Sequence, residues 1–394
     1  MAVSNGCNIT EQPEHVTEDV DPELVFRYSS WVTSWLVVGY VGVLVGGLVG
    51  NGYVVAVVHS APRMRTTTNL LLVNLAVADM LVLVVCVPAN LIANILLPWV
   101  LGNTMCKLVA YLQNVTVSAS INTLIAISID RYMAICHDPL RCQPMSSCAV
   151  QRHIVIIWGL AIATMLPTIV YQNQYINEHY GVPMCGLTFP SQWVEQVFFC
   201  LVVLLCYVLP LLFILLSYCF IFHTVSNRHM IGEETTPRLT ETSGIARAKS
   251  NQRMLIDKSK VKVLRMVCVV VLIFFLTWAP LYLINGYINL FGYPRHGDEL
   301  ESFVFTLYPL AQWLGLANSA VNPLIYAYFN KKFRHGFAAF LKATWCFGVF
   351  STDPNGSARS RSSSIPLSTY LSRRFTIDQG AAMKTTNEQP INLL

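Results

Sequence analysis

The residues of this chain that could perform chemistry lie at the two ends of one long apolar stretch. Asp130, Arg131 and Tyr132 follow a run, beginning at Leu108, that is almost free of charge. Ionisable groups at such a boundary usually have a function and a partner, because leaving them in lipid is costly. Gln113 precedes Arg131 by eighteen residues, which is about five helical turns, or roughly 27 Å. One helix face would then carry a hydrogen-bonding group near one membrane surface and a charge pair near the other. That arrangement suits a device that senses on one side and reports on the other.

Groups typical of an enzyme or a transporter do not accompany these residues. The nine His residues are scattered, mostly in predicted loops, and form no paired-His zinc motif. No Ser or Cys has an evident base beside it. Transporters usually show paired repeats with several ionisable groups at the midplane, whereas this chain has one midplane acid, Asp79, and no internal repeat. We therefore expect neither catalysis nor transport.

The composition indicates that the bilayer is the solvent. Hydrophobic residues make up 54% of the 394 residues, charged residues 12%, and the mean hydropathy is +0.51, whereas soluble domains are roughly 25% charged. Apolar stretches of about twenty residues predict transmembrane helices. The predicted spans are 34–59, 69–95, 104–136, 152–172, 194–223, 262–289 and 303–328. The fold class is thus all-α, a seven-transmembrane helix bundle with a short amphipathic surface helix after span seven.

Basic residues predict the orientation. Arg63 and Arg65 join spans one and two, Arg141 and Arg152 lie between spans three and four, and the segment between spans five and six is also basic. By the positive-inside rule, the N-terminus is outside and the C-terminus inside. We expect a multi-pass protein of the plasma membrane with an extracellular N-terminus. The first thirty residues are polar and acidic, without the apolar core of a signal peptide. The acidic outer segments would attract a cationic ligand, although solvated loops alone would also explain them.

Three sites of covalent modification follow from this orientation. Cys106 and Cys185 both fall on the oxidising outer side, so we expect a disulfide between them, with Cys7 left over. Asn8 begins a glycosylation sequence on the same side. Cys346, on the inner side, is a candidate for palmitoylation, and a free thiol is the alternative.

The chain divides into one membrane domain and three flanking parts. Phe333 and Phe337 are four residues apart beside basic residues, which is typical of a helix lying on the membrane surface. The Ser-rich tail suits protein kinases and is polar enough to be disordered. The predicted parts are a disordered extracellular head at 1–33, the bundle at 34–328, the surface helix at 329–344 and a disordered cytosolic tail at 345–394.

Taken together, the motifs resemble the rhodopsin-like family of G-protein-coupled receptors over most of residues 35–340. Each mark alone is weak, since Pro in a span is often only a kink, but their order on the expected spans is specific. The marks are Gly50-Asn51, Asn74 to Asp79, Asp130-Arg131-Tyr132, Trp158, Pro167, Pro210, Tyr218, Phe274, Trp278, Pro280, Asn322-Pro323 and Tyr326.

This resemblance implies a switch in the inner half of the bundle. Asp130 would hold Arg131 at rest and release it when span six swings outward, although an Arg at a helix end can also simply reach toward water. A heterotrimeric G protein would then bind the open state. The residues implied in coupling and switching are Asp130, Arg131, Tyr132, Tyr218, Phe274, Trp278, Pro280, Asn322, Pro323 and Tyr326.

A buried carboxylate in span two needs a partner. Asp79 lies at mid-membrane depth, where an isolated carboxylate would protonate or find a cation. By the resemblance, it forms a regulatory sodium site with Ser120, Asn318, Ser319 and Asn322. A protonated Asp in a polar network is the alternative. No other cofactor is implied.

The ligand is indicated by Gln113. Receptors for small amines place an Asp at this position, whereas Gln hydrogen-bonds to amides but cannot neutralise an amine. The stretch at 105–120 is similar to the orexin, neuropeptide FF and allatotropin receptors, as is Asn285. The chain departs from the orexin type at Tyr132, Trp278 and Gln312, which points to a relative with a ligand of its own.

This closer resemblance implies an amidated neuropeptide with its C-terminus bound in the outer half of the bundle, and the acidic outer segments favour a basic one. The expected ligand-binding residues are Asn90, Gln113, Val117, Asn285 and Gln312, although ordinary interhelical hydrogen bonding would also explain polar residues there. A receptor for a lipid or another small non-amine ligand is the alternative. The loop at 170–193 would form a strand hairpin over the mouth. Arrestin and receptor kinases are expected at the tail, and no nucleic acid is expected.

Overall fold

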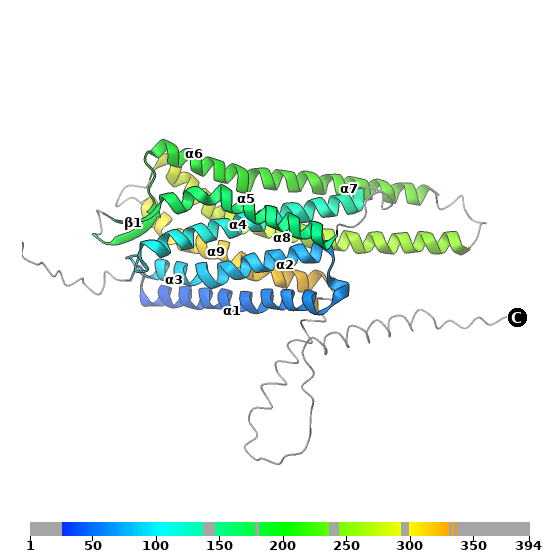
Figure 1. Cartoon of the computed structure of the whole chain (residues 1–394), viewed down its shortest axis with the longest axis horizontal. Helices are drawn as coiled ribbons and strands as arrows, with labels where there is room; N and C mark the ends of the chain where they lie inside the picture. The colour runs from blue at the N-terminus through cyan, green and yellow to red at the C-terminus, as the bar shows by residue number, and fades with distance from the viewer. Residues whose placement is uncertain are drawn as a thin grey trace, which may run out of the picture.

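The computed structural model shows a bundle of long helices running side by side (Figure 1). It describes residues 26–136, 146–177, 181–235, 244–292 and 299–330, together with Phe333, Arg334 and Phe337. The predicted head at 1–33 lies largely outside these residues, and the tail at 345–394, Asn8 and Cys346 lie wholly outside them. Those predictions stay predictions.

Seven crossings of the bundle are built from nine helices and two π-helical turns within the described ranges. In chain order they are α1 (Ser30–Ser60), α2 (Thr67–Leu81), η3 (Val82–Cys86), α3 (Val87–Ile95), α4 (Gly102–Cys136), α5 (Ser147–Tyr171), α6 (Gln192–Val203), η4 (Leu204–Val208), α7 (Leu209–Thr235), α8 (Gly244–Phe291) and α9 (Glu299–Phe329). The elements α2, η3 and α3 form one crossing, and α6, η4 and α7 form another.

The predicted seven-helix membrane fold is confirmed. Six of the crossings are long and apolar enough to span a membrane, and α9 is the seventh, packed along α1 and α8. Many large apolar side chains point away from the bundle, as on α7, where Phe222 is 73% exposed. Polar side chains such as Asn51, Asn74 and Asp79 are buried inside. A bilayer outside the bundle explains this pattern.

Two helices continue beyond the spans that hydropathy predicts. The structure extends α7 to Thr235 rather than 223, and α8 begins at Gly244 rather than 262. Hydropathy locates only the part of a helix that lies in lipid, whereas helical hydrogen bonds can continue into water. The inner ends of α7 and α8 accordingly project past the other helices (Figure 1).

The two π-helical turns each come shortly before a proline. Pro88 follows η3 and Pro210 follows η4. Proline cannot donate the helical hydrogen bond and its ring crowds the preceding turn, and a wider turn accommodates both effects. Each extra residue rotates the side chains beyond the turn by about 100° relative to an ideal helix. The direction of Asn90, beyond η3, therefore cannot be counted from Asp79 at the ordinary helical period.

A β-hairpin closes the outer end of the bundle, at the left in Figure 1. Strand β1 (Gln172–Ile176) pairs antiparallel with β2 (Pro183–Leu187), with Gln172 opposite Leu187. The predicted disulfide is present, with an S–S distance of 2.00 Å between Cys106 at the start of α4 and Cys185 in β2. The Trp99 backbone N–H also donates to the Pro183 carbonyl over 2.7 Å. Both the hairpin and its attachment to α4 agree with the sequence prediction.

The inner end of α9 is held to α1. Pro323 of α9 lies so close to Gly50 that a Cβ there would sit 2.9 Å from the proline ring, so glycine permits this approach. The Tyr53 hydroxyl donates to the Phe333 carbonyl over 2.5 Å, and the Tyr53 and Phe337 rings are 5.2 Å apart. Phe333 and Phe337 thus share one face, as their spacing predicts. Most of the predicted surface helix at 329–344 lies outside the described residues.

Candidate functional site

A cavity of about 520 Å³ lies between the outer ends of the helices and the hairpin. Its walls come from α3, α4, α6, α8 and α9, and residues of β1 and β2 also line it. Its depth is limited by Trp278 of α8, which is 6% exposed. A space of this size, open between the helices of a bundle, is typical of a ligand-binding site.

Uncharged polar side chains form a connected network along one wall. The Asn90 amide donates to Gln113 Oε1 over 2.7 Å, and the Gln312 amide donates to Asn90 Oδ1 over 2.8 Å. The Asn94 amide donates to both Gln312 Oε1 and the Tyr40 hydroxyl, each over 2.8 Å. The Gln113 amide nitrogen has no hydrogen bond to any residue that the structure describes. It is the free donor at one end of the network.

The structure brings three of the five predicted ligand-binding residues, Asn90, Gln113 and Gln312, into this network. Asn285 lines the cavity too, but its amide donates to the Leu281 carbonyl of its own helix over 2.9 Å. Val117, one turn beyond Gln113, is 8% exposed and packs in the hydrophobic core. Ligand contact by any of the five stays a prediction.

Two members of the network, Asn94 and Tyr40, were not predicted. Asn94 lies four residues after Asn90, so both fall on one face of α3, and this spacing was the available signal. Tyr40 lies in α1 and is 1% exposed. Its contact with Asn94 spans 54 residues of sequence, and no local pattern reveals such a pair.

Charged groups also line the cavity, and the sequence analysis missed them. Glu195, in the first turn of α6, shares its cavity-lining face with Phe198 and Phe199. Its carboxylate has no ion pair or hydrogen bond with any described residue. Arg27, which precedes α1, lines the cavity as well, and its backbone N–H donates to the Ile95 carbonyl over 3.0 Å. The cavity thus has neutral amides on one wall and an acid on another, and the basic residue Arg27 also lines it.

An aromatic layer separates the cavity from the inner half. The Trp278 ring lies 6.3 Å from Phe274 and 6.4 Å from Tyr282. A Cβ at Gly315 of α9 would lie 3.1 Å from the Trp278 ring, so the absence of a side chain there lets α8 and α9 close around the indole. Movement of the Trp278 ring would therefore displace both α8 and α9.

Below this layer lies a buried polar cluster around Asp79. The Asn322 amide donates to Asp79 Oδ2 over 2.9 Å, and Ser319, one helical turn before Asn322, is buried as well. Asn322 Oδ1 is buried with no hydrogen-bond partner in the described part of the chain. Asn318 instead donates to Thr277 of α8 over 3.0 Å, and Ser120 is 5% exposed. The four predicted companions of Asp79 lie on α4 and α9 and are all buried, and one of them, Asn322, bonds to it.

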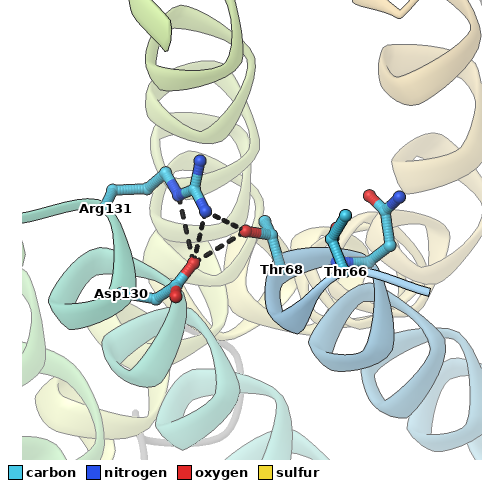
Figure 2. Close-up of polar contacts among 5 residues, drawn as sticks. Thr66, Thr68, Asp130 and Arg131 are labelled. Atoms are coloured by element: carbon cyan, nitrogen blue, oxygen red, sulfur yellow. Dashed lines mark hydrogen bonds and ion pairs between the residues drawn. The ribbon is translucent and has the colours of Figure 1, made fainter. Parts of the chain in front are cut away.

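At the inner end of the bundle, Asp130 and Arg131 form an ion pair with each other. Arg131 Nη2 lies 2.5 Å from Asp130 Oδ2. The Thr68 hydroxyl of α2 donates to the same carboxylate oxygen over 2.7 Å and accepts a hydrogen bond from Arg131. Figure 2 shows Thr68 reaching the pair from α2. Thr68 was not predicted, because its partner is 62 residues away in sequence.

Apolar packing closes the same end. Ile135 of α4, Ile221 of α7 and Leu264 of α8 form one buried cluster, against which Tyr132 and Tyr218 pack. The Tyr218 hydroxyl is buried and lies near enough to Arg131 to interact with it electrostatically. Tyr326 is 1% exposed and its ring lies 6.1 Å from Phe333. The inner end of the bundle is thus closed, with α8 packed on α4 and Arg131 held by Asp130. The switch predicted for these residues stays a prediction.

A membrane bundle with an outer cavity and a closed inner charge pair defines a seven-helix membrane receptor. Residues 50–326 match the family model described as 7 transmembrane receptor (rhodopsin family). The chain belongs to this family and is a multi-pass protein of the plasma membrane with an extracellular N-terminus. The family resemblance inferred from the motifs is therefore confirmed, and the transporter alternative is not supported.

Three neuropeptide receptors are similar to this chain over most of its length. Neuropeptide FF receptor 1 of Rattus norvegicus is 30% identical over 90% of this chain and 79% of its own length. Neuropeptide FF receptor 2 of Rattus norvegicus is 30% identical over 84% of this chain and 78% of its own. Neuropeptide FF receptor 2 of Mus musculus is 31% identical over 79% of this chain and 73% of its own length.

Proposed function

We propose that this protein is a cell-surface receptor for an extracellular neuropeptide with an amidated C-terminus and that it activates heterotrimeric G proteins. The observation that carries the proposal is the amide network Gln113–Asn90–Gln312 on the cavity wall. A terminal carboxamide both donates and accepts hydrogen bonds, as Asn and Gln side chains do. Such a group can join the network at the free Gln113 amide without burying a charge. The names of the similar receptors support a peptide ligand.

Glu195 favours a peptide that is also basic. The Glu195 carboxylate has no partner among the described residues and lies on a partly desolvated wall, so a cationic side chain of the ligand would restore part of the free energy lost on desolvation. Phe198 and Phe199 beside it offer aromatic faces that suit a cation. A small amine is a weaker candidate, because the acid lies on α6 rather than at Gln113, and a neutral lipid would leave Glu195 unpaired.

The receptor would act by shifting a conformational equilibrium rather than by covalent chemistry. A ligand favours the open state only through its higher affinity for that state. Opening separates Leu264 of α8 from Ile135 of α4 and frees Arg131 for a G protein. Arrestin and receptor kinases would then act on the open state and on the Ser-rich tail.

A regulatory sodium ion is part of this proposal. The site offers a buried carboxylate, Asp79, and the buried oxygen Asn322 Oδ1, which lacks a partner among the described residues. Oxygen ligands are what hard cations prefer. Asp79, Ser319 and Asn322 would hold the ion, with Ser120 beside them. A bound cation would neutralise Asp79 and stabilise the closed packing around it.

The amide assignment is tested with paired peptides. Cells expressing the receptor are exposed to a panel of neuropeptides, neuropeptide FF among them, each as the amide and as the free acid, with calcium and cyclic-AMP readouts. Gln113→Ala should lower the potency of the active amide about ten- to hundredfold, because it removes one partner of the ligand and leaves the Asn90 amide N–H without its acceptor. Gln151→Ala is the matched control, since Gln151 is exposed on α5 away from the cavity.

The outcomes separate the alternatives. An amide that is far more potent than its acid in the wild type, with the preference reduced in Gln113→Ala, supports the proposal. An unchanged dose response in Gln113→Ala would move the site elsewhere. A wild-type response to lipids or small molecules but to no peptide would favour the alternative ligand class. Glu195→Gln should weaken basic peptides only.

A further inference from the structure

The amide side chains on the cavity wall form a chain of hydrogen bonds that has a direction. The Asn94 amide donates to Gln312 Oε1 over 2.8 Å, and the Gln312 amide donates to Asn90 Oδ1 over 2.8 Å. The Asn90 amide in turn donates to Gln113 Oε1 over 2.7 Å. Each amide thus donates with its nitrogen to the oxygen of the next one. This amide chain begins at Asn94 and ends at the N–H groups of Gln113, which have no acceptor among the described residues.

The direction of the amide chain decides which atom the cavity offers to a ligand. A carboxamide has an acceptor on one side and donors on the other, and a rotation of about 180° exchanges them. A single rotated member would place oxygen against oxygen or N–H against N–H, so all members keep one direction. In the direction observed, Gln113 offers an N–H and favours an acceptor on the ligand. In the reverse direction, Gln113 would offer its oxygen and favour a donor.

Tyr40 of α1 bonds to the far end of the amide chain. The Asn94 nitrogen donates both to Gln312 and to the Tyr40 hydroxyl, each over 2.8 Å. Tyr40 is 1% exposed and packs in a core cluster with Leu36 and Leu316, so its hydroxyl is held in place. Asn94 lines the cavity, whereas Tyr40 is not among the residues that line it. Tyr40 therefore acts on the cavity through Asn94 and not by touching a ligand.

Resting on the proposed function, we propose that Tyr40 is a positioning residue, which holds the amide chain in the direction that turns an N–H of Gln113 toward the ligand. Asn94 is 3% exposed, and its second N–H has no acceptor other than Tyr40 in the part of the chain that the structure describes.

Loss of the Tyr40 hydroxyl leaves this buried N–H without an acceptor. Rotation of the Asn94 amide then becomes favourable, because its oxygen needs only one donor and Gln312 can supply it. The amide chain reverses, and Gln113 presents its oxygen to the cavity. The group recognised on the ligand, a carbonyl oxygen, is thus set from α1, none of whose described residues lines the cavity.

The first test compares two C-terminal groups on the ligand. The peptide amide that activates the wild type is also made as its methyl ester, which can accept a hydrogen bond but cannot donate one. Tyr40→Phe should raise the ratio of amide potency to ester potency about tenfold, because the amide can turn and donate to the Gln113 oxygen and the ester cannot. Surface expression of each variant is measured alongside to check folding.

Tyr53→Phe is the matched control. Tyr53 also lies on α1 and is 4% exposed, and its hydroxyl also donates to a carbonyl, that of Phe333 at the inner end of the helix. The substitution removes the same group from the same helix without touching the amide chain, so the ratio should stay within about twofold of the wild type. An equal rise of the ratio in both variants would mean that a general loosening of α1 is responsible and would overturn the positioning role.

The second test cuts the amide chain between Tyr40 and the ligand. Gln312→Ala removes the member that joins Asn94 to Asn90, so Tyr40 can no longer set the direction of Gln113. Adding Tyr40→Phe to Gln312→Ala should therefore leave the amide-to-ester ratio unchanged. A residue that acts independently of the amide chain would change the ratio by the same factor in either background.

The results also separate this inference from the function on which it rests. If an amidated peptide activates the wild type and Gln113→Ala weakens it, yet Tyr40→Phe leaves the ratio unchanged or raises it equally in the Gln312→Ala background, the positioning role is wrong and the peptide receptor stands. If no peptide activates the wild type, both are overturned. A rise of the ratio in Tyr40→Phe that disappears in Gln312→Ala supports both.

Discussion

The outer and inner halves of the bundle use polar groups of different kinds. In the outer half, Gln113, Asn90 and Gln312 are neutral, bonded to each other, and border a cavity. In the inner half, Asp130 and Arg131 are charged and bonded to each other, with side chains only 14% and 17% exposed. Neutral amides can exchange partners at little cost, whereas separating a partly buried ion pair is costly. The outer half is therefore suited to binding a ligand, and the inner half is suited to stabilising one conformation.

The two halves share no polar contact that the structure describes. The aromatic layer of Phe274, Trp278 and Tyr282 lies between the cavity and the Asp79 cluster. Because Gly315 of α9 packs against the Trp278 ring of α8, a shift of this layer would move both helices. This comparison predicts that substitutions in one half change binding and signalling to different degrees.

The largest expected effect follows from removing the charge that the inner half holds. Arg131→Ala should abolish G-protein activation, because the open state would then lack the group we assign to the G protein. Peptide binding should remain within a few-fold of the wild type, since Arg131 lies far from the cavity. Radioligand binding and a nucleotide-exchange assay on the same membranes measure the two.

Arg152→Ala is the matched control, because Arg152 is exposed near the inner end of α5 and has no part in the charge pair. Signalling by Arg131→Ala at the wild-type level would remove the assigned role. A loss of binding as large as the loss of signalling would show that the halves are not separable in the way the comparison states.

A smaller effect is expected from loosening the same pair. Thr68→Val keeps the shape of the side chain but removes both hydrogen bonds to Asp130 and Arg131. Loss of about 1.5 kcal/mol from the closed state would raise the open fraction, and with it signalling without ligand, about tenfold. Thr67→Val, on the neighbouring residue, should leave basal signalling unchanged. A basal rate in Thr68→Val equal to the wild type would mean that Thr68 does not favour the closed state.

The sequence predicted the inner charge pair and the outer disulfide better than the polar wall of the cavity, for a physical reason. Asp130 and Arg131 are adjacent, and their cost in an apolar run makes them conspicuous. Cys106 and Cys185 could be paired because the orientation places both outside. These features depend on local sequence and on membrane topology alone.

The outer site depends on contacts that local sequence does not encode. The π-helical turn η3 changes the direction in which Asn90 and Asn94 point. Counting residues along an ideal α-helix does not predict that direction. Tyr40 joins the network from α1, and Glu195 faces the cavity from the first turn of α6, whose position against the cavity the local sequence does not encode. Thr68 shows that the same limit applies inside, since its contact joins α2 to α4.

The smallest expected effect concerns the cluster between the halves. If sodium at Asp79 stabilises the closed state, replacing choline by sodium at constant ionic strength should lower the affinity of the active peptide about fivefold, near the lower end of common allosteric couplings. Asp79→Asn keeps the size of the side chain and a hydrogen-bonding partner for Asn322 but removes the charge that holds the cation. The peptide should then bind with one affinity in both salts.

Potassium in place of sodium controls for a general salt effect, which would screen Glu195 and weaken a basic peptide equally in either salt. A sodium effect that persists in Asp79→Asn would place the ion elsewhere. Loss of the effect with unchanged binding in choline would show that Asp79 acts on the equilibrium between states and not on the cavity. The cluster around Asp79 would then couple ligand binding in the outer half to the conformation of the inner half.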